Sequence, residues 1–155
     1  MRIAEIMTSK VFTVEQHDLI DRVFFLINYE KIRHLPVVEK GKVIGIVSDR
    51  DLYKVLGPKS NSNAIEGSSK NSELHVVNTK VQNIMRRGVI TTSPDALVSE
   101  VAGIMADHKI GAVPVIQNDK LVGIVSAIDI LRVFSKMEQL RENREKRITE
   151  GVSHS

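Results

Sequence analysis

Cysteine and tryptophan are absent from this 155-residue sequence, and the aromatic residues amount to four Phe and two Tyr. Without cysteine, the chain can form neither a disulfide framework nor a cysteine-ligated zinc site, and it has no cysteine nucleophile. A lack of disulfides suits a reducing compartment, so we expect a cytoplasmic protein. Hydrophobic residues still make up 42% of the chain, which is enough to form a folded core.

Long apolar runs and a strong charge of one sign are also missing. No uninterrupted apolar run approaches the roughly 18 residues that a membrane span needs, and residues 1–12 lack the apolar segment of a signal peptide. The 22 basic and 19 acidic residues leave a formal charge of only +3. The basic residues concentrate over positions 136–147, where interleaved Glu residues indicate a solvated helix face. We therefore expect neither a membrane protein nor a nucleic-acid-binding protein.

Recognisable catalytic and metal-binding motifs are missing as well. None of the five histidines has a partner at the spacing of a metal-ligand pair. The sequence has no Gly-x-Ser-x-Gly elbow, no phosphate-binding Gly-x-x-x-x-Gly-Lys-Ser/Thr loop and no Gly-x-Gly-x-x-Gly fingerprint. These absences predict a protein that is not an enzyme and that uses neither a metal nor a catalytic cofactor.

The most informative feature that is present is an internal repeat with an offset of about 78 positions, over which the two halves align without a gap. The matching segments are Ile6-Met7 with Ile84-Met85, Lys31-Ile32 with Lys109-Ile110, Pro36-Val37 with Pro114-Val115, Gly45-Ile46-Val47-Ser48 with Gly123-Ile124-Val125-Ser126, and Asp51 with Asp129. Each half is therefore one copy of the same structural unit.

Each half predicts the same order of elements. A short strand (11–14 and 89–92) precedes a helix with apolar residues at helical spacing. Ser93-Pro94 has the composition of a helix start in the second half. Two β-rich runs follow in each half (34–38 with 43–47, and 112–116 with 121–125), separated by four residues that favour a hairpin. A closing helix begins after Ser48 and after Ser126. The Met residues at 7 and 85 are interpreted as core fillers.

The repeat predicts a mixed α/β protein, more strictly α+β, made of two β-α-β-β-α units that pack through their small sheets about a pseudo-twofold axis. The expected domains are repeat 1 (1–57), a flexible Gly- and Ser-rich linker (58–78), repeat 2 (79–135) and a C-terminal helical extension with a tail (136–155). The extension is predicted because Phe134, Met137 and Leu140 continue the apolar stripe of the last helix.

The motif Gly-Ile-Val-Ser-x-x-Asp, which ends the last strand and opens the closing helix of both halves, carries a resemblance to a known family. Together with the Ile-Met openings and the segments 33–38 and 111–116, it resembles a tandem pair of CBS domains, also called a Bateman module. The resemblance covers about residues 3–56 and 81–134. It implies a regulatory module that binds adenosine-type ligands (AMP, ADP, ATP or S-adenosylmethionine) in clefts between the repeats. It also implies a homodimer and a separate regulated protein.

The resemblance further implies which residues bind the nucleotide. The Ser hydroxyl would contact phosphate at the helix N-terminus, and the Asp carboxylate would accept from both ribose hydroxyls. The first expected site groups Ser48 and Asp51 with Thr91, Ile110, Gly111 and Ala112. The second expected site groups Ser126 and Asp129 with Thr13, Ile32, Arg33 and His34. Pro36 and Pro114 are also expected among the binding residues. Because of Arg33, we expect the Asp129 site to carry more positive charge than the Asp51 site.

A second interpretation of the Ser-x-x-Asp motifs stays open at this stage. Ser-x-x-Asp before an apolar run is also typical of a helix capping box, which needs no ligand. The rival function is therefore a protein-interaction adaptor or dimerisation module with empty clefts. The dimer itself is also expected on physical grounds, because outward apolar residues on the helices (Phe24, Phe25, Ile27 and Met105) predict an exposed patch.

Overall fold

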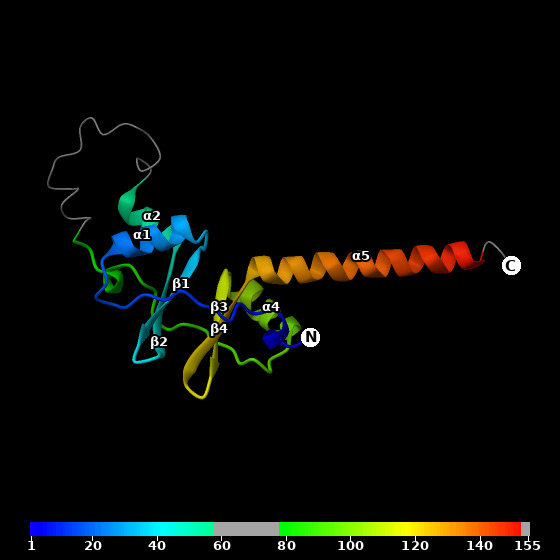
Figure 1. The fold of residues 1–155 in the computed structure, drawn as a ribbon, viewed down its shortest axis with the longest axis horizontal. Helices are drawn as coiled ribbons and strands as arrows, with labels where there is room; N and C mark the ends of the chain where they lie inside the picture. Colours follow the sequence, from blue (N-terminus) through cyan, green and yellow to red (C-terminus); the bar gives the residue numbers. More distant parts are fainter. Residues whose placement is uncertain (58–77, 153–155) are drawn as a thin grey trace.

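The computed structural model describes residues 1–57 and 78–152, and almost all of the predicted linker (58–78) lies outside these described residues. The elements, in chain order, are η1 (Ile3–Glu5), α1 (Ile20–Tyr29), β1 (His34–Glu39), β2 (Lys42–Ser48), α2 (Asp49–Leu56), η3 (Val81–Asn83), α4 (Val98–His108), β3 (Ala112–Gln117), β4 (Lys120–Ser126) and α5 (Ala127–Val152). The predicted α+β class is confirmed, with the two halves repeating one order of helices and strands (Figure 1).

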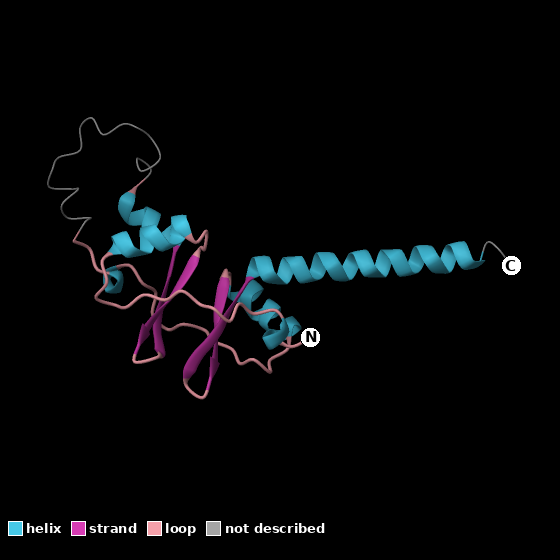
Figure 2. Cartoon of the chain, viewed as in Figure 1, coloured by secondary structure: helices cyan, strands magenta, loops and turns pink. Residues whose placement is uncertain are grey.

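Both predicted hairpins are present as two-stranded antiparallel sheets, β1 with β2 and β3 with β4. Each hairpin turns over two residues with positive φ, Lys40-Gly41 (51° and 79°) and Asn118-Asp119 (52° and 63°). Two consecutive left-handed residues form the turn that best matches the twist of paired strands. The two hairpins lie side by side, and β2 contacts β4 across the middle of the molecule (Figure 2).

The predicted strands at 11–14 and 89–92 are wrong in extent, since each is reduced to one bridging residue. Val14 pairs in parallel with Val37, and Thr92 pairs in parallel with Val115. The Val14 N–H donates to the Pro36 carbonyl oxygen, and the Val14 carbonyl oxygen accepts from the Val38 N–H. Thr92 makes the same two bonds with Pro114 and Ile116. The sheets therefore gain only a single residue at this edge.

The predicted helix start at Ser93-Pro94 is also wrong. Helix α4 begins at Val98 with Leu97 as its N-cap, while Ser93 and Pro94 form a turn before it. The reason is tertiary: the Pro94 carbonyl oxygen accepts a hydrogen bond from the Ala4 N–H at 2.9 Å. The turn is thus paired with the beginning of the chain rather than continued as helix.

The segment that opens each half packs on the other half. Residues around η1 hydrogen-bond to the segment before α4, and Ile3 is fully buried in the core of the second half. Residues around η3 hydrogen-bond to the segment before α1, and Val81 is fully buried in the core of the first half. The two cores therefore have different boundaries from the two sequence repeats, and each half contributes to both.

Each of the two exchanged segments also places a methionine against a glycine of the other half. A Cβ added to Gly45 would lie 2.7 Å from the Met85 sulfur, and one added to Gly123 would lie 2.5 Å from the Met7 sulfur. Each hairpin has a β-bulge at the same position, and the glycine of that hairpin lies beside it. The glycines are thus required by the close approach of the exchanged segments, and the methionines fill the space above them, as predicted.

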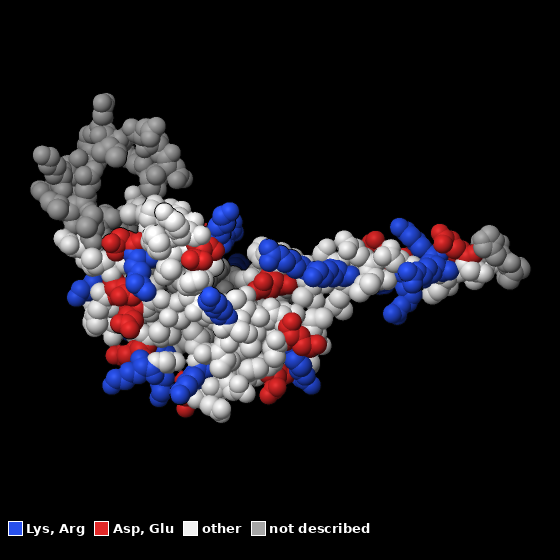
Figure 3. Space-filling model, in the orientation of Figure 1, with Lys and Arg blue, Asp and Glu red and all other residues white. Residues whose placement is uncertain are grey.

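The helices leave several apolar side chains in solvent. Phe24 and Phe25 are exposed as predicted, at 44% and 52%, but Ile27 (8%) and Met105 (4%) belong to the two cores, so their assignment to the outer face is wrong. Helix α5 runs past the repeat as predicted, and it projects far from both hairpins (Figure 1). Figure 3 shows basic and acidic side chains mixed over one face of the molecule and along α5. No described helix combines the length and apolar character needed to cross a membrane.

Candidate functional site

A cleft of about 380 Å³ lies between the two halves and is built by both of them. Its lining consists of Arg33, His34, Ile46, Ser48, Asp49, Arg50, Asp51, Arg86, Lys109, Ile110, Gly111 and Ala112. This volume lies within the range of about 300–1,000 Å³ that is common for small-molecule sites. Two other depressions lie on the outer faces of α1 and α5, and each is lined by one helix alone.

The first wall of the cleft is the beginning of α2. Ser48 is the N-cap, and its hydroxyl oxygen accepts a hydrogen bond from the Asp51 N–H at 3.3 Å. In return, Asp51 Oδ2 accepts from the Ser48 N–H at 2.9 Å and from the Ser48 hydroxyl at 3.0 Å. The capping box is therefore formed, so the motif stabilises the helix start whatever else it does.

Asp51 also forms an ion pair across the boundary between the halves. Its second oxygen, Oδ1, accepts from Arg86 Nε at 3.1 Å, and only 7% of the Asp51 side chain is exposed. Arg86 is held by its backbone, because its N–H donates to the Ile46 carbonyl and its carbonyl accepts from the Ile46 N–H. This pair joins the segment that opens the second half to the first turn of α2.

The opposite wall is the segment that enters β3. Lys109 ends α4 in the left-handed conformation (φ 55°), which turns Ile110, Gly111 and Ala112 into the cleft. The Gly111 carbonyl oxygen accepts from the Ala127 N–H at the start of α5. The structure therefore brings together most of the first predicted group, namely Ser48, Asp51, Ile110, Gly111 and Ala112.

His34 crosses the cleft and lies against Gly111. A Cβ on Gly111 would be 2.9 Å from His34 Nε2, so a larger residue there needs the imidazole to move. Burial lowers the pKa of His34 below its usual value of 6.5. Asp49 opposes this shift, and the charge of Arg33 adds to it. Burial thus favours the neutral form of the imidazole.

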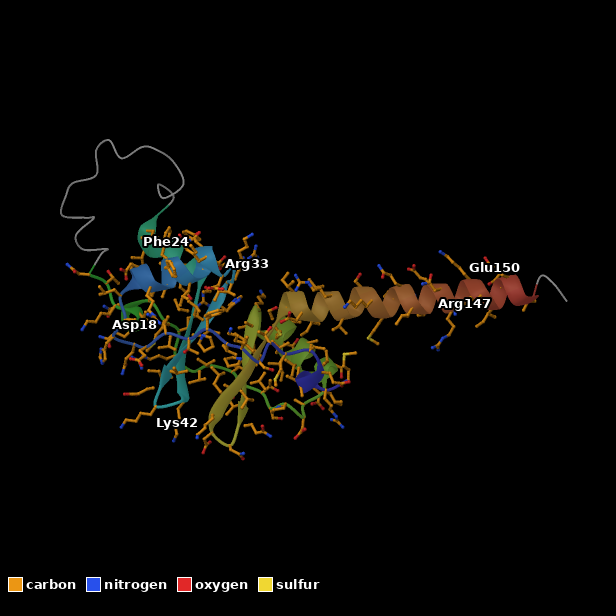
Figure 4. The ribbon with its side chains drawn as sticks, in the orientation of Figure 1. Asp18, Phe24, Arg33, Lys42, Arg147 and Glu150 are labelled. Carbon is orange, nitrogen blue, oxygen red and sulfur yellow. The ribbon has the colours of Figure 1, made fainter. Side chains whose placement is uncertain are left out.

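Arg33 and His34, which were expected beside Asp129, line the cleft that contains Asp51. The Arg33 carbonyl oxygen accepts from the Asp49 N–H at the start of α2. The expected excess of positive charge at Asp129 stays a prediction. Figure 4 shows Arg33 at the end of α1, close to the beginning of β1. With Arg50, Arg86 and Lys109 in the same lining, the Asp51 cleft is rich in cations.

The second Ser-x-x-Asp motif repeats the capping geometry. Asp129 Oδ2 accepts from the Ser126 N–H and from the Ser126 hydroxyl, both at 2.8 Å. Its Oδ1 lies 4.0 Å from Arg132 Nη1, and 22% of the side chain is exposed. The carboxylate is therefore more open to solvent than that of Asp51.

The remaining predicted site residues are placed as follows: Thr13 and Thr91 precede the bridging residues of the sheets, Pro36 and Pro114 are buried in β1 and β3, and Ile32 packs on the first core. Thr91 and Pro114 are outside the lining of the Asp51 cleft. The expected site residues did not include five members of this lining, namely Ile46, Asp49, Arg50, Arg86 and Lys109. A signal existed for Arg86, since it follows the repeated Ile-Met opening where the first half has Thr8.

The class of protein follows from this architecture and from the match to a family model. The model of the CBS domain matches twice, over residues 3–58 and 81–136, which is more than half of the chain. The chain therefore belongs to the CBS domain family and contains two copies of the domain in tandem.

Similar sequences occur in proteins of different lengths. The homoserine O-acetyltransferase of Methanococcoides burtonii is 33% identical over 85% of this chain, which is 24% of that protein. Protein MJ1426 of Methanocaldococcus jannaschii is 30% identical over 86% of this chain and 91% of its own length. The chain spans only 24% to 51% of the length of four of its curated relatives.

A solved structure has the same fold. The CBS domain pair of protein MJ0100, in complex with 5′-methylthioadenosine and S-adenosyl-L-methionine, has a TM-score of 0.72 and 28% sequence identity. The alignment covers 88% of this chain and 98% of that chain. The likeness therefore extends over both domains of the pair.

Proposed function

We propose that this protein is a regulatory module that binds an adenosine nucleotide (AMP, ADP or ATP, or S-adenosylmethionine) in the cleft between its two CBS domains. The observation that carries the proposal is the meeting of Ser48 and Asp51 from one half with Ile110, Gly111 and Ala112 from the other. A ligand held by both halves stabilises one relative position of them, so binding is converted into a mechanical signal.

The chemistry of each wall suits one part of such a ligand. The Asp51 carboxylate is an acceptor of the kind that two ribose hydroxyls need. The start of α2, where the helix dipole is positive, and the hydroxyl of Ser48 suit a phosphate. Ile110 offers an apolar face for the base, and the backbone of Gly111 and Ala112 offers polar groups for its edge. The adenosine-type ligands in the MJ0100 structure support the same choice.

Thermal unfolding with a panel of nucleotides tests the proposal. A ligand at 100 times its Kd stabilises the folded protein by roughly 2.7 kcal/mol, a shift of several degrees in Tm for a chain of this size. We expect a shift with at least one adenosine nucleotide and none with the matching guanosine or cytidine nucleotide. Unchanged Tm values over the whole panel would instead favour the adaptor with empty clefts.

The Asp residues separate binding from capping. Asp51→Ala should weaken nucleotide binding by about 1.5–3 kcal/mol, while the lost cap alone costs about 1 kcal/mol of stability. Ser126→Ala is the control for stability alone, since it removes a cap of the same kind from the other motif. If Asp51→Ala lowers Tm but binds nucleotide as the parent does, the motif serves only as a cap.

We also propose that the chain forms a homodimer through the helical faces of the pair. On α1, Phe24 (44%), Phe25 (52%) and Tyr29 (74%) are exposed, and the rings of Phe25 and Tyr29 stack with centroids 4.3 Å apart. Figure 4 places Phe24 on the side of α1 that faces away from the hairpins. Closed twofold symmetry is the commonest way to cover such a patch.

The second half offers a surface that fits this patch. The positions of Phe24 and Phe25 are taken on α4 by Ala102 and Gly103, and a Cβ on Gly103 would meet nothing within 4 Å. Arg22 of α1 likewise has Glu100 as its counterpart on α4. The bulky side chains of α1 match the small residues of α4, and the positive Arg22 matches the negative Glu100. Both features favour a head-to-tail dimer, in which α1 of one copy packs on α4 of the other.

Cross-linking tests this arrangement cleanly, because the chain has no native cysteine. Mixing Phe25→Cys with Gly103→Cys should give a disulfide-linked pair under oxidation, whereas each variant alone should not. Light scattering should give about twice the 17.3 kDa mass of one chain. A mass near 17.3 kDa that persists on concentration would exclude the dimer, and linkage of Phe25→Cys to itself would reverse the orientation.

A further inference from the structure

The carboxylate that the proposed function assigns to ribose is already occupied within the protein. Both oxygens of Asp51 are engaged, Oδ2 by the Ser48 N–H and hydroxyl and Oδ1 by Arg86 Nε at 3.1 Å. The Asp51 side chain is only 7% exposed, whereas the Arg86 side chain is 59% exposed. The buried partner is thus the acceptor, and the exposed partner is the group that is able to move.

The second half lacks this arrangement. Asp129 makes the same two hydrogen bonds to Ser126, but its Oδ1 is 4.0 Å from the nearest paired cation, Arg132. Thr8 stands where the other half has Arg86: it pairs with Ile124 as Arg86 pairs with Ile46. The ion pair is therefore a property of one cleft and not of the repeated fold.

The position of Arg86 restricts where its side chain goes when it leaves Asp51. Two backbone hydrogen bonds of 2.8 and 3.0 Å hold Arg86 to Ile46 in β2, so the guanidinium moves about a fixed backbone and stays at the cleft. Arg33, Arg50 and Lys109 line the same cleft and form no ion pair within the described part of the chain. The surroundings of Arg86 thus favour an anion that arrives with the ligand.

We propose that Arg86 is a specificity-determining latch that admits phosphorylated adenosine ligands to the Asp51 cleft and disfavours uncharged nucleosides. The inference rests on the proposed function, in which Asp51 binds the ribose. A nucleoside that takes Oδ1 leaves the guanidinium without its carboxylate, whereas a nucleotide replaces that carboxylate with a phosphate, which an Arg side chain also binds in a bidentate manner. The expected site at Asp129 has no latch, and so it does not discriminate in this way.

Calorimetric titration of the full chain with AMP and with adenosine tests the latch. The titrations are made in an Asp129→Asn background, which keeps an acceptor for the cap but removes the second carboxylate. In this background we expect AMP to bind at least about tenfold more tightly than adenosine, given the usual strength of a hydrogen bond to a charged group. Arg86→Ala should weaken AMP and tighten adenosine, so that the two affinities converge. Arg87→Ala, which removes an exposed neighbouring cation, should leave their ratio unchanged.

The converse variant installs the latch where it is absent. Thr8→Arg in an Asp51→Asn background should lower the affinity of the Asp129 cleft for adenosine and leave AMP bound at least as tightly. An unchanged ratio in Arg86→Ala, with AMP binding still lost in Asp51→Ala, would overturn the latch but leave the proposed function standing. If the parent protein binds none of AMP, ADP, ATP and S-adenosylmethionine, the proposed function fails, and the latch fails with it. Binding of S-adenosylmethionine alone would overturn only the latch.

Discussion

The two closing helices begin with the same Ser-x-x-Asp motif and the same capping box, yet the protein uses them differently. Helix α2 has eight residues and buries both Asp51 (7% exposed) and Leu52 (0%). Helix α5 has 26 residues and buries none, and the counterpart of Leu52, Ile130, is only partly buried. The motif therefore determines where a helix starts, and the segment packed against it determines how deeply the helix sits.

The exchanged segments account for much of this difference. Arg86 comes from the segment that packs on the first half and covers Asp51, while Thr8 at the equivalent place leaves Asp129 partly exposed. The two segments otherwise match, so the difference between Arg86 and Thr8 explains why Asp51 is buried in an ion pair while Asp129 is partly exposed. The repeat thus determines the shared fold, and the positions at which the two halves differ determine the properties of each site.

The largest effect that this comparison predicts is on stability. Leu52→Ala removes a fully buried side chain and should lower the free energy of unfolding by about 2–5 kcal/mol. Ile130→Ala, at the equivalent position of α5, should cost clearly less, because its site is already open to solvent. Urea unfolding at one protein concentration measures both values. Equal losses would mean that α5 is covered in solution, for example by a second chain.

Sequence reasoning succeeded where the signal was local or repeated. The hairpins, the closing helices and the capping boxes follow from turn residues, apolar spacing and the Ser-x-x-Asp motifs, which depend on neighbours along the chain. The second copy supported these elements by repeating their pattern. The same reasoning grouped Ser48 and Asp51 with residues 110–112, because the resemblance placed a site between the repeats.

The failures have a common physical cause, which is contact between segments far apart in sequence. Ser93-Pro94 reads as a helix start, but Pro94 is paired with Ala4 at the beginning of the chain. The bridge between Arg86 and Asp51 spans 35 positions, and no local pattern indicates it. Arg33 lines the Asp51 cleft for a similar reason, since its carbonyl oxygen accepts from the Asp49 N–H at the start of α2.

The next effect concerns a feature that the two halves share. Gly45→Ala and Gly123→Ala each place a methyl group against a methionine sulfur and a backbone carbonyl of the exchanged segment. Overpacking of this kind costs about 1–3 kcal/mol, and we expect similar losses in the two variants, read as a fall in Tm. Gly151→Ala is the control, since a Cβ there meets nothing within 4 Å. A large loss in only one of the two would show that the exchange holds the halves together unequally.

The smallest effect concerns His34, whose counterpart in the second half is Ala112. Burial lowers the pKa of His34 from 6.5, while Asp49 and Asp51 oppose the shift and Arg33 and Arg86 add to it. Because the folded-state pKa lies below the unfolded value, His34 contributes stability that is present above pH 6.5 and is lost as the pH falls through the folded pKa. His34→Asn should flatten the dependence of Tm on pH over this window.

An NMR titration of the His34 imidazole measures the same quantity directly and connects it to the cleft. In the unliganded protein, the midpoint should lie below 6.5. Addition of AMP should raise the midpoint, because a phosphate near Arg33 and Arg86 brings negative charge beside the imidazole and favours its protonated form. Adenosine should have a smaller effect, since it carries no charge. A midpoint that saturating AMP leaves unchanged would place the phosphate away from His34, and so away from the cations that line the Asp51 cleft.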